Sequence, residues 1–531
     1  MNPPPSTVPA PRLSGSVLWQ LVAICLIILG GKLWLIGTYS SPLPFLDQWK
    51  GEGAELLRPW MKGELRAADL FVPFNEHRIL PTKLLVLALF EANQHQWDAQ
   101  VQMVAGALVH VGSAFFLGAF LVRRLGPSRK WLIFAALLAL FGLPFDWQNT
   151  LWGFQSQFYF LILFTLITFW GLGGHPAGSA RWWIGAGAGL LACFSMGSGG
   201  FAGMALAAWL TVKLLLDSTA RRQRENWVTL ALSIALGGLA LALYTPPASV
   251  SLNSLSAPTF GAFLHGIGLH LGWPNGRSAL LALPAFAPLA ILFAIHLRKL
   301  RRNTLGTTST SLEEFLFPLA IWVGLQAAAL SYCRNGPAAG IISRYMDLFA
   351  LGTLVNFVCL LRLIELAARH QVARWPHRVA LAGTVGWIIL VITGLTALTQ
   401  RNLRLDLPSM NQIQRVQAAA IRQFSISDQI SVFGGKRLFG MTPDEIEVLA
   451  DVLRDPLIRE TLPMGLGVRR TPTPPGPLST TAQALAGGWE LPIGTGVLIL
   501  LLVAISDALT TRRAGQARES KASLVLSGTV A

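Results

Sequence analysis

The sequence predicts an all-α polytopic membrane protein with about twelve membrane-spanning helices. Two observations support this prediction. Hydrophobic residues make up 53% of the 531 residues, and charged residues only 13%, which is about half the usual share in a soluble protein. The apolar residues also gather into runs close to the length that a helix needs to cross the hydrocarbon layer while satisfying its own backbone.

The predicted spans follow one another along the chain. The first is longer than the apolar part of a signal peptide and has no small-residue cleavage site after it, so we expect it to be retained. The approximate bounds of the spans are residues 17–37, 100–122, 130–145, 158–173, 182–196, 200–216, 227–244, 279–297, 314–332, 346–364, 379–398 and 491–508.

Basic residues predict the orientation in the membrane. They gather after most even-numbered spans, although only Arg181 follows the fourth. The positive-inside rule then makes both chain ends cytoplasmic, with a disordered N-terminus over 1–16 and an irregular tail over 509–531. Lipid headgroups and orientation also explain the net charge of +16, and no nucleic-acid-binding module is visible. We expect the cell inner (plasma) membrane.

Two longer segments are then extracytoplasmic. The transmembrane domain, 17–398, contains a long first outer loop over 39–100. A helical segment with a Pro-rich linker, 399–490, precedes the last span, 491–508. In this segment Thr442-Pro443-Asp444-Glu445 predicts a helix start, because threonine suits the N-cap and glutamate the third helical position.

Asp47 is the first candidate for chemistry. It lies shortly after the first span, near the predicted outer surface of the membrane. A carboxylate there can act as a general base toward an acceptor hydroxyl, although it would equally suit the cap of a turn.

Glu76, His77 and Arg78 form a second ionisable group before the next span. Arg78 is expected to hold a phosphate, with His77 bonded to it, and Glu76 to orient an acceptor or pair with Arg78. The alternative is a solvated loop with internal ion pairs.

Arg344 and Tyr345 are predicted at the outer end of the tenth span. A guanidinium at this depth favours an anionic partner, and its planar fork can hold two phosphate oxygens. Lys83 and Arg334 are further candidates for the same task. The alternative for Arg344 is contact with ordinary lipid headgroups.

Trp152 and Gln155 belong to a segment rich in tryptophan and amides, Trp147 to Gln157. Flat aromatic faces and amides suit a sugar ring, although an interfacial aromatic belt has a similar composition. Neither the histidines nor the four cysteines have a metal-ligand spacing, so no metal site is predicted. A divalent cation held by Asp47 and Glu76 remains open.

The chain resembles the GT-C superfamily of membrane glycosyltransferases, in an uncharacterised bacterial branch. The resemblance implies a polyprenyl-phosphate-linked sugar as donor, a lipid or glycan acceptor, and a catalytic acid in the first outer loop, at Asp47. A second acid of that motif is replaced by Gln48. The stretches that carry the resemblance are Phe45 to Trp49, Asn75 to Arg78, Trp152 to Gln155, Ser343 to Tyr345 and Leu453 to Ile458.

Two other functions remain open. A multi-pass transporter or a flippase of lipid-linked glycans would suit the number of spans, but repeated halves and charges near mid-span are not apparent. A polysaccharide polymerase or ligase would use a lipid-linked glycan as its donor.

Overall fold

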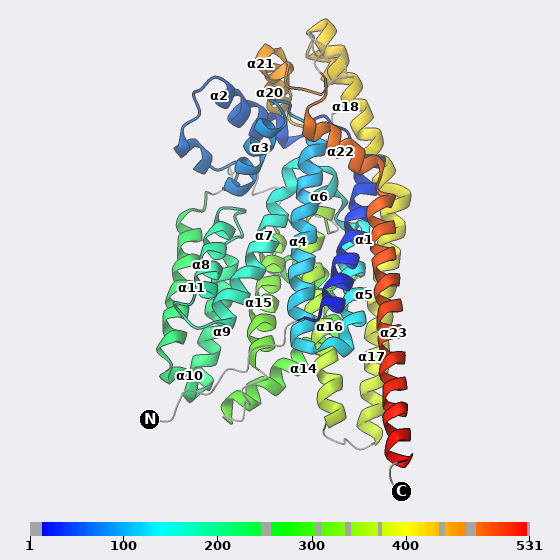
Figure 1. Cartoon of the computed structure of the whole chain (residues 1–531). Helices are drawn as coiled ribbons and strands as arrows, with labels where there is room; N and C mark the ends of the chain where they lie inside the picture. Colours follow the sequence, from blue (N-terminus) through cyan, green and yellow to red (C-terminus); the bar gives the residue numbers. More distant parts are fainter. Residues whose placement is uncertain are drawn as a thin grey trace.

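The computed structural model describes residues 13–245, 256–302, 310–334, 341–369, 374–434, 441–463 and 474–527. Every regular element within these ranges is a helix, apart from one isolated bridge between Phe74 and His77. Long helices form a bundle, and shorter helices gather at one end of it (Figure 1). We call this end the loop face; its described residues are 40–98, 144–155, 407–434, 441–463 and 474–487.

Within the described ranges, ten helical stretches are long and apolar enough to cross a membrane. The protein is therefore a polytopic helical membrane protein, as predicted. Two further predicted spans, 182–196 and 200–216, coincide with the shorter helices α8 (Ala180–Cys193) and α9 (Phe201–Leu216), so the total number of spans stays a prediction. The main helices of these ten stretches are α1 (Gly15–Tyr39), α4 (Ala99–Leu125), α5 (Lys130–Phe141), α7 (Ser156–Thr168), α11 (Arg224–Ala242), α14 (Ala282–Arg301), α15 (Thr310–Cys333), α16 (Ser343–Arg369), α17 (Arg374–Arg401) and α23 (Glu490–Ser527).

Short helices build the loop face and the connections. At the loop face lie η1 (Trp49–Leu57), α2 (Arg58–Met61), η2 (Ala67–Phe71), α3 (Leu80–Ala92), η4 (Pro144–Asp146), α6 (Trp147–Leu151), η5 (Gly153–Gln155), α18 (Leu407–Ser427), α20 (Pro443–Arg454), α21 (Pro456–Arg459) and α22 (Pro477–Gly487). The loop face also contains α19 (Ser431–Gly434). Elsewhere the structure has η3 (Pro127–Arg129), η6 (Phe169–Gly173), α10 (Ser218–Arg222), α13 (Phe260–Leu271), η7 (Ala279–Leu281) and η8 (Asn402–Asp406).

Two apolar cores hold these layers together. The larger core lies inside the bundle, where α1, α4, α5, α7, α15 and α16 bury their apolar side chains. The smaller core lies at the loop face, where Trp49 and Trp97 pack with Leu449 and Leu453 of α20. The segment before the last span is thus fastened onto the first loop by burial of apolar surface, which drives association in water.

The local helix start at Thr442 is confirmed. The Thr442 hydroxyl accepts a bond from the Glu445 amide at 3.3 Å, and the Glu445 carboxylate accepts one from the Thr442 amide at 2.6 Å. Both unpaired donors at this helix end are thereby satisfied.

Helical structure continues past two predicted boundaries. Residue 398 is not a helix end, because Arg378–Ser427 forms one helical stretch of 50 residues through the π-helical turn η8. No glycine or proline interrupts the chain between 395 and 407, so nothing local stops the helix there. The C-terminal tail is also helical to Ser527. Residues 1–12 and 471–473, for which disorder and a linker were predicted, lie outside the described residues.

Candidate functional site

Asp47 lies in a tight turn that is held from several sides. Leu46 has a φ of +47°, and the Gln48 side chain accepts a bond from the Phe45 amide at 3.0 Å. The Phe45 carbonyl accepts a bond from the Trp152 indole at 2.9 Å, and the Pro44 carbonyl accepts one from Gln417 of α18 at 2.8 Å. The backbone is thus fixed, while the Asp47 side chain stays half-buried.

The Asp47 side chain lines a pocket at the loop face. The pocket is also lined by Lys50 of η1 and by Asn75. Two further lining residues are Met441, just before α20, and Glu445, within α20. Burial raises the pKa of Asp47 to about 6, and the charge of Glu445 acts in the same direction. At neutral pH most molecules therefore carry an ionised Asp47 that can still accept a proton.

Glu76 and His77 lie on a tight turn beside this pocket. Phe74 and His77 exchange two backbone bonds of 2.8 and 3.0 Å, and Asn75 takes a φ of +50°, which asparagine tolerates better than most residues. The Phe74 ring packs against Phe154 with centroids 5.1 Å apart. The turn therefore presents Glu76 and His77 together from a fixed backbone.

Glu76 and His77 already have partners. Arg334 donates to the Glu76 carboxylate at 2.5 Å, and the Gly197 amide donates to Nδ1 of His77 at 3.1 Å. Burial lowers the pKa of His77, so the neutral ring has its proton on Nε2, which lies 3.7 Å from Glu76. Because Arg334 occupies Glu76, it competes with any divalent cation that Asp47 and Glu76 would share.

Arg344 is the second residue of α16 and lies near the charged side chains of Asp47 and His77. Its guanidinium lies 5.3 Å from the Tyr345 ring centroid, and no ion pair joins it to any described residue. Asp47 and His77 both respond to it, because its positive charge lowers their pKa values. We call Asp47, Glu76, His77, Arg334 and Arg344 the loop-face charge cluster.

Other predicted site residues have structural contacts instead. Arg78 donates to the carbonyls of Leu243 at 3.0 Å and Phe71 at 2.6 Å, which joins the first loop to the end of α11. Lys83 donates to the carbonyls of Asp69 at 3.1 Å and Val72 at 2.8 Å. Both side chains thus tie the loop together through backbone carbonyls, and the predicted phosphate contacts stay a prediction.

The predicted sugar platform is also buried. Trp152 is 5% exposed and Gln155 3%, so neither side chain presents a surface to a ligand in this conformation. Tyr345 is 8% exposed and packs against Phe158 with centroids 5.6 Å apart. These residues support the turns that carry Asp47 and Arg344.

A buried glutamate anchors the helix that follows Asp47. Glu52 accepts bonds from Gln48 at 3.1 Å, Gln102 at 2.8 Å and Trp97 at 2.9 Å, all on one carboxylate oxygen. Burial raises the pKa of Glu52 to about 7. The sequence analysis did not select Glu52. The available signal was its position between Gly51 and Gly53, five residues after Asp47.

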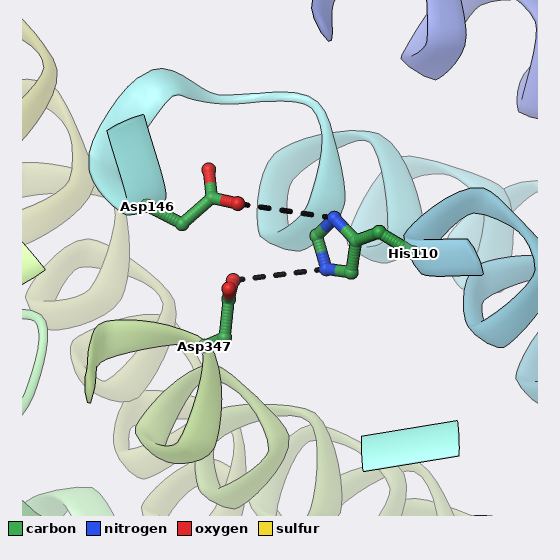
Figure 2. A group of neighbouring side chains, drawn as sticks. All are labelled: His110, Asp146 and Asp347. Atoms are coloured by element: carbon green, nitrogen blue, oxygen red, sulfur yellow. Dashed lines mark ion pairs between the residues drawn. The ribbon is translucent and has the colours of Figure 1, made fainter. Parts of the chain in front are cut away.

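A second set of ionisable residues is enclosed within the helical bundle. Figure 2 shows His110 of α4 between Asp146 of η4 and Asp347 of α16. Its Nδ1 lies 3.8 Å from Asp146, and its Nε2 lies 3.7 Å from Asp347. Lys32 of α1 donates to both oxygens of Asp146. We call these four residues the buried cluster; each is no more than 3% exposed.

The buried cluster corrects an expectation from the sequence. Charges near mid-span were not apparent there, whereas His110 lies near the middle of a predicted span and Lys32 and Asp347 lie closer to the ends of theirs. An ionisable residue inside an apolar run is itself a functional signal. From their positions along α1, α4 and α16, these residues lie roughly 6–17 Å below the loop-face ends of their helices.

His110, Asp146 and Asp347 also offer ligand atoms within 4.8 Å of one another. However, an ammonium already contacts both oxygens of Asp146, and the two nitrogens of His110 face different carboxylates. With one positive and two negative side chains, a divalent ion would leave an excess positive charge in a buried site. The arrangement therefore does not suit a divalent metal.

Comparison with known proteins adds no relative to this picture. No family model matches the chain, and neither a curated protein nor a solved structure shows significant similarity to it.

Proposed function

We propose that the protein is a membrane glycosyltransferase of the GT-C type, which transfers a sugar from a polyprenyl-phosphate donor to a lipid or glycan acceptor at the extracytoplasmic face. One observation carries the proposal. Asp47 and Arg344, which form no ion pair with any described residue, lie close enough at the loop face for Arg344 to lower the pKa of Asp47.

Asp47 would act as the general base. With a pKa of about 6, it is mostly ionised at neutral pH and can take the proton of an acceptor hydroxyl. As the acceptor oxygen bonds to the sugar carbon, the bond from that carbon to the phosphate oxygen breaks. The electron pair leaves with the lipid phosphate.

Arg344 would hold the donor phosphate. Its guanidinium has no carboxylate partner among the described residues, and a planar fork can bind two phosphate oxygens. It would also stabilise the negative charge that develops on the leaving phosphate. Glu76, bound by Arg334, would position this group of charges and not act as a second base.

A transfer assay tests the proposal. The purified protein in nanodiscs would be given radiolabelled polyprenyl-phosphate sugars and a membrane lipid extract. We expect wild type to label a lipid or glycan and Asp47→Asn to lose about 10²–10⁴-fold of that rate. The matched control is Glu447→Gln, which removes an exposed carboxylate from α20. Equal transfer by wild type and Asp47→Asn would remove Asp47 from the mechanism.

A second candidate is a multi-pass transporter or a flippase of lipid-linked glycans. The buried cluster favours it, because ionisable groups enclosed by membrane helices often lie on ion or substrate pathways. A polymerase or ligase would use the loop-face charge cluster in the same way, with a lipid-linked glycan as donor. For this test the protein would be reconstituted in liposomes. Movement of a labelled lipid-linked glycan from one leaflet to the other, without sugar transfer, would favour the flippase.

A further inference from the structure

The buried cluster has an unbalanced charge. The Lys32 ammonium is positive, and the carboxylates of Asp146 and Asp347 are negative when ionised. With a neutral His110, the sum is one negative charge in a site where no member is more than 3% exposed. An isolated charge in such surroundings is costly, and in practice a group binds or releases a proton to avoid it.

The partners of Asp146 are complete. Its carboxylate accepts bonds from Lys32 and from the Tyr159 hydroxyl, the latter at 2.8 Å. Thr150 lies between them, 3.1 Å from both the Lys32 ammonium and the Tyr159 hydroxyl. Asp146 is therefore stabilised as an anion, and the uncompensated charge falls on the other side of the cluster.

Asp347 and His110 lack such partners. Asn149 donates to one oxygen of Asp347 at 2.9 Å, while no donor reaches the other oxygen and the neighbouring Asp146 carboxylate adds a second negative charge. Neither nitrogen of His110 has a hydrogen bond, although its ring is held between Tyr159 and Phe141, at centroid distances of 4.4 and 4.9 Å. The two unsatisfied groups face each other at 3.7 Å (Figure 2).

We infer that the buried cluster is a binding site for one proton, shared between His110 and Asp347. One proton brings the cluster to neutrality and supplies the missing donor between the imidazole nitrogen and the carboxylate oxygen. The groups that face it are Lys32 from α1, Asp146 from η4, Tyr159 from α7 and the amide of Asn149 from α6. The inference does not depend on the proposed transfer of sugar.

The site is also connected to the loop face. Asn149 donates both to Asp347 and to the carbonyl of Arg344, at 2.9 Å in each case. Arg344 precedes Asp347 by three residues, about 4.5 Å along α16. The proton thus lies directly beneath the turn that carries the unpaired guanidinium.

Charge-altering variants test the inference through the pH dependence of the melting temperature. A proton held by the folded protein and released by the unfolded chain makes stability fall as pH rises. We expect this contribution to vanish in Asp347→Asn, which is neutral without a proton. In Lys32→Met two carboxylates need protons, so the contribution should become about twice that of wild type. Both slopes are measured from mildly acidic to mildly alkaline pH.

The double variant Lys32→Met with Asp347→Asn separates charge from folding defects. It leaves one buried carboxylate and should return to the slope of wild type, even if Lys32→Met alone does not fold. Glu447→Gln serves as the control for loss of an exposed acid. An unchanged slope in Asp347→Asn would overturn the proton site. A rise in the melting temperature of wild type with Zn²⁺ or Mn²⁺, absent in Asp347→Asn, would replace it with a metal site.

Discussion

Asp47 owes its properties to residues that are remote from it in the sequence. Burial and Glu445 raise its pKa, and Arg344 lowers it. Asp47 itself could be selected from the sequence because it follows the first span. The contribution of Glu445 could not, since almost 400 residues separate the two, and only the packing of α20 against η1 brings them together.

Replacement of Glu445 by glutamine should shift the pH dependence of transfer. Removing the negative charge lowers the pKa of Asp47, so the general base stays ionised to a lower pH. The acidic limb of the pH–rate profile should therefore move to lower pH, while glutamine still supports the helix start. Glu447→Gln, on the same helix, should leave the limb in place. A shift of equal size in both variants would contradict a specific effect of Glu445 on Asp47.

Glu52 should make stability depend on pH. Its pKa rises from 4.5 to about 7 on folding, so its contribution is complete below pH 4.5 and is lost as pH rises through about 7. The loss amounts to about 3 kcal/mol. Melting curves of Glu52→Gln should lack this part of the pH dependence, whereas Glu64→Gln, an exposed acid of the same loop, should retain it. Parallel curves for wild type and Glu52→Gln would show that the carboxyl does not titrate in this range.

At the scale of elements, local signals identified the helices well. The apolar runs predicted the helices of the bundle, and the sequence from Thr442 to Glu445 predicted the start of α20. The continuation of the helix beyond α17, through η8 into α18, was not predicted, because the sequence becomes polar near 399 without any helix-breaking residue. Polarity marks where a membrane span ends, but it does not end a helix.

The helix start at Thr442 should contribute to the stability of the loop face. Thr442→Ala removes the acceptor for the Glu445 amide and should cost about 1 kcal/mol of unfolding free energy. Because Glu445 lines the Asp47 pocket, the same change should loosen that wall. Amide hydrogen exchange in α20 would measure both effects. Thr393→Ala, an exposed change inside α17, is the control; equal protection of α20 in the two variants would contradict the role of the cap.

At the scale of the whole molecule, the two ends of the bundle carry different sets of charged side chains. Opposite the loop face, Arg129 pairs with Glu365 at 3.0 Å and Arg362 with Glu313 at 3.3 Å, joining η3, α15 and α16. The buried cluster could not be predicted as a unit, because its four members come from four separate elements. Each was visible as a polar residue near or within an apolar run, but only the packing of α1, α4 and α16 shows that they meet.

The orientation in the membrane can be measured with single cysteines. In a background with Cys333→Ser, Glu64→Cys lies at the loop face and Gln223→Cys lies after α10, at the opposite end. Because basic residues gather near Gln223, we expect a membrane-impermeant maleimide to label Glu64→Cys in intact cells and Gln223→Cys only after lysis. The reverse pattern would place the loop face in the cytoplasm.

The most direct test of the central claim is the steady-state rate of sugar transfer by Asp47→Asn and Arg344→Gln, each measured over a range of donor concentrations. If Asp47 is the base and Arg344 holds the donor phosphate, Asp47→Asn should lower kcat with little change in KM for the donor. Arg344→Gln should raise that KM and also lower kcat, because the same charge stabilises the leaving phosphate. Donor kinetics that are the same as wild type in both folded variants would contradict the assignment of the site.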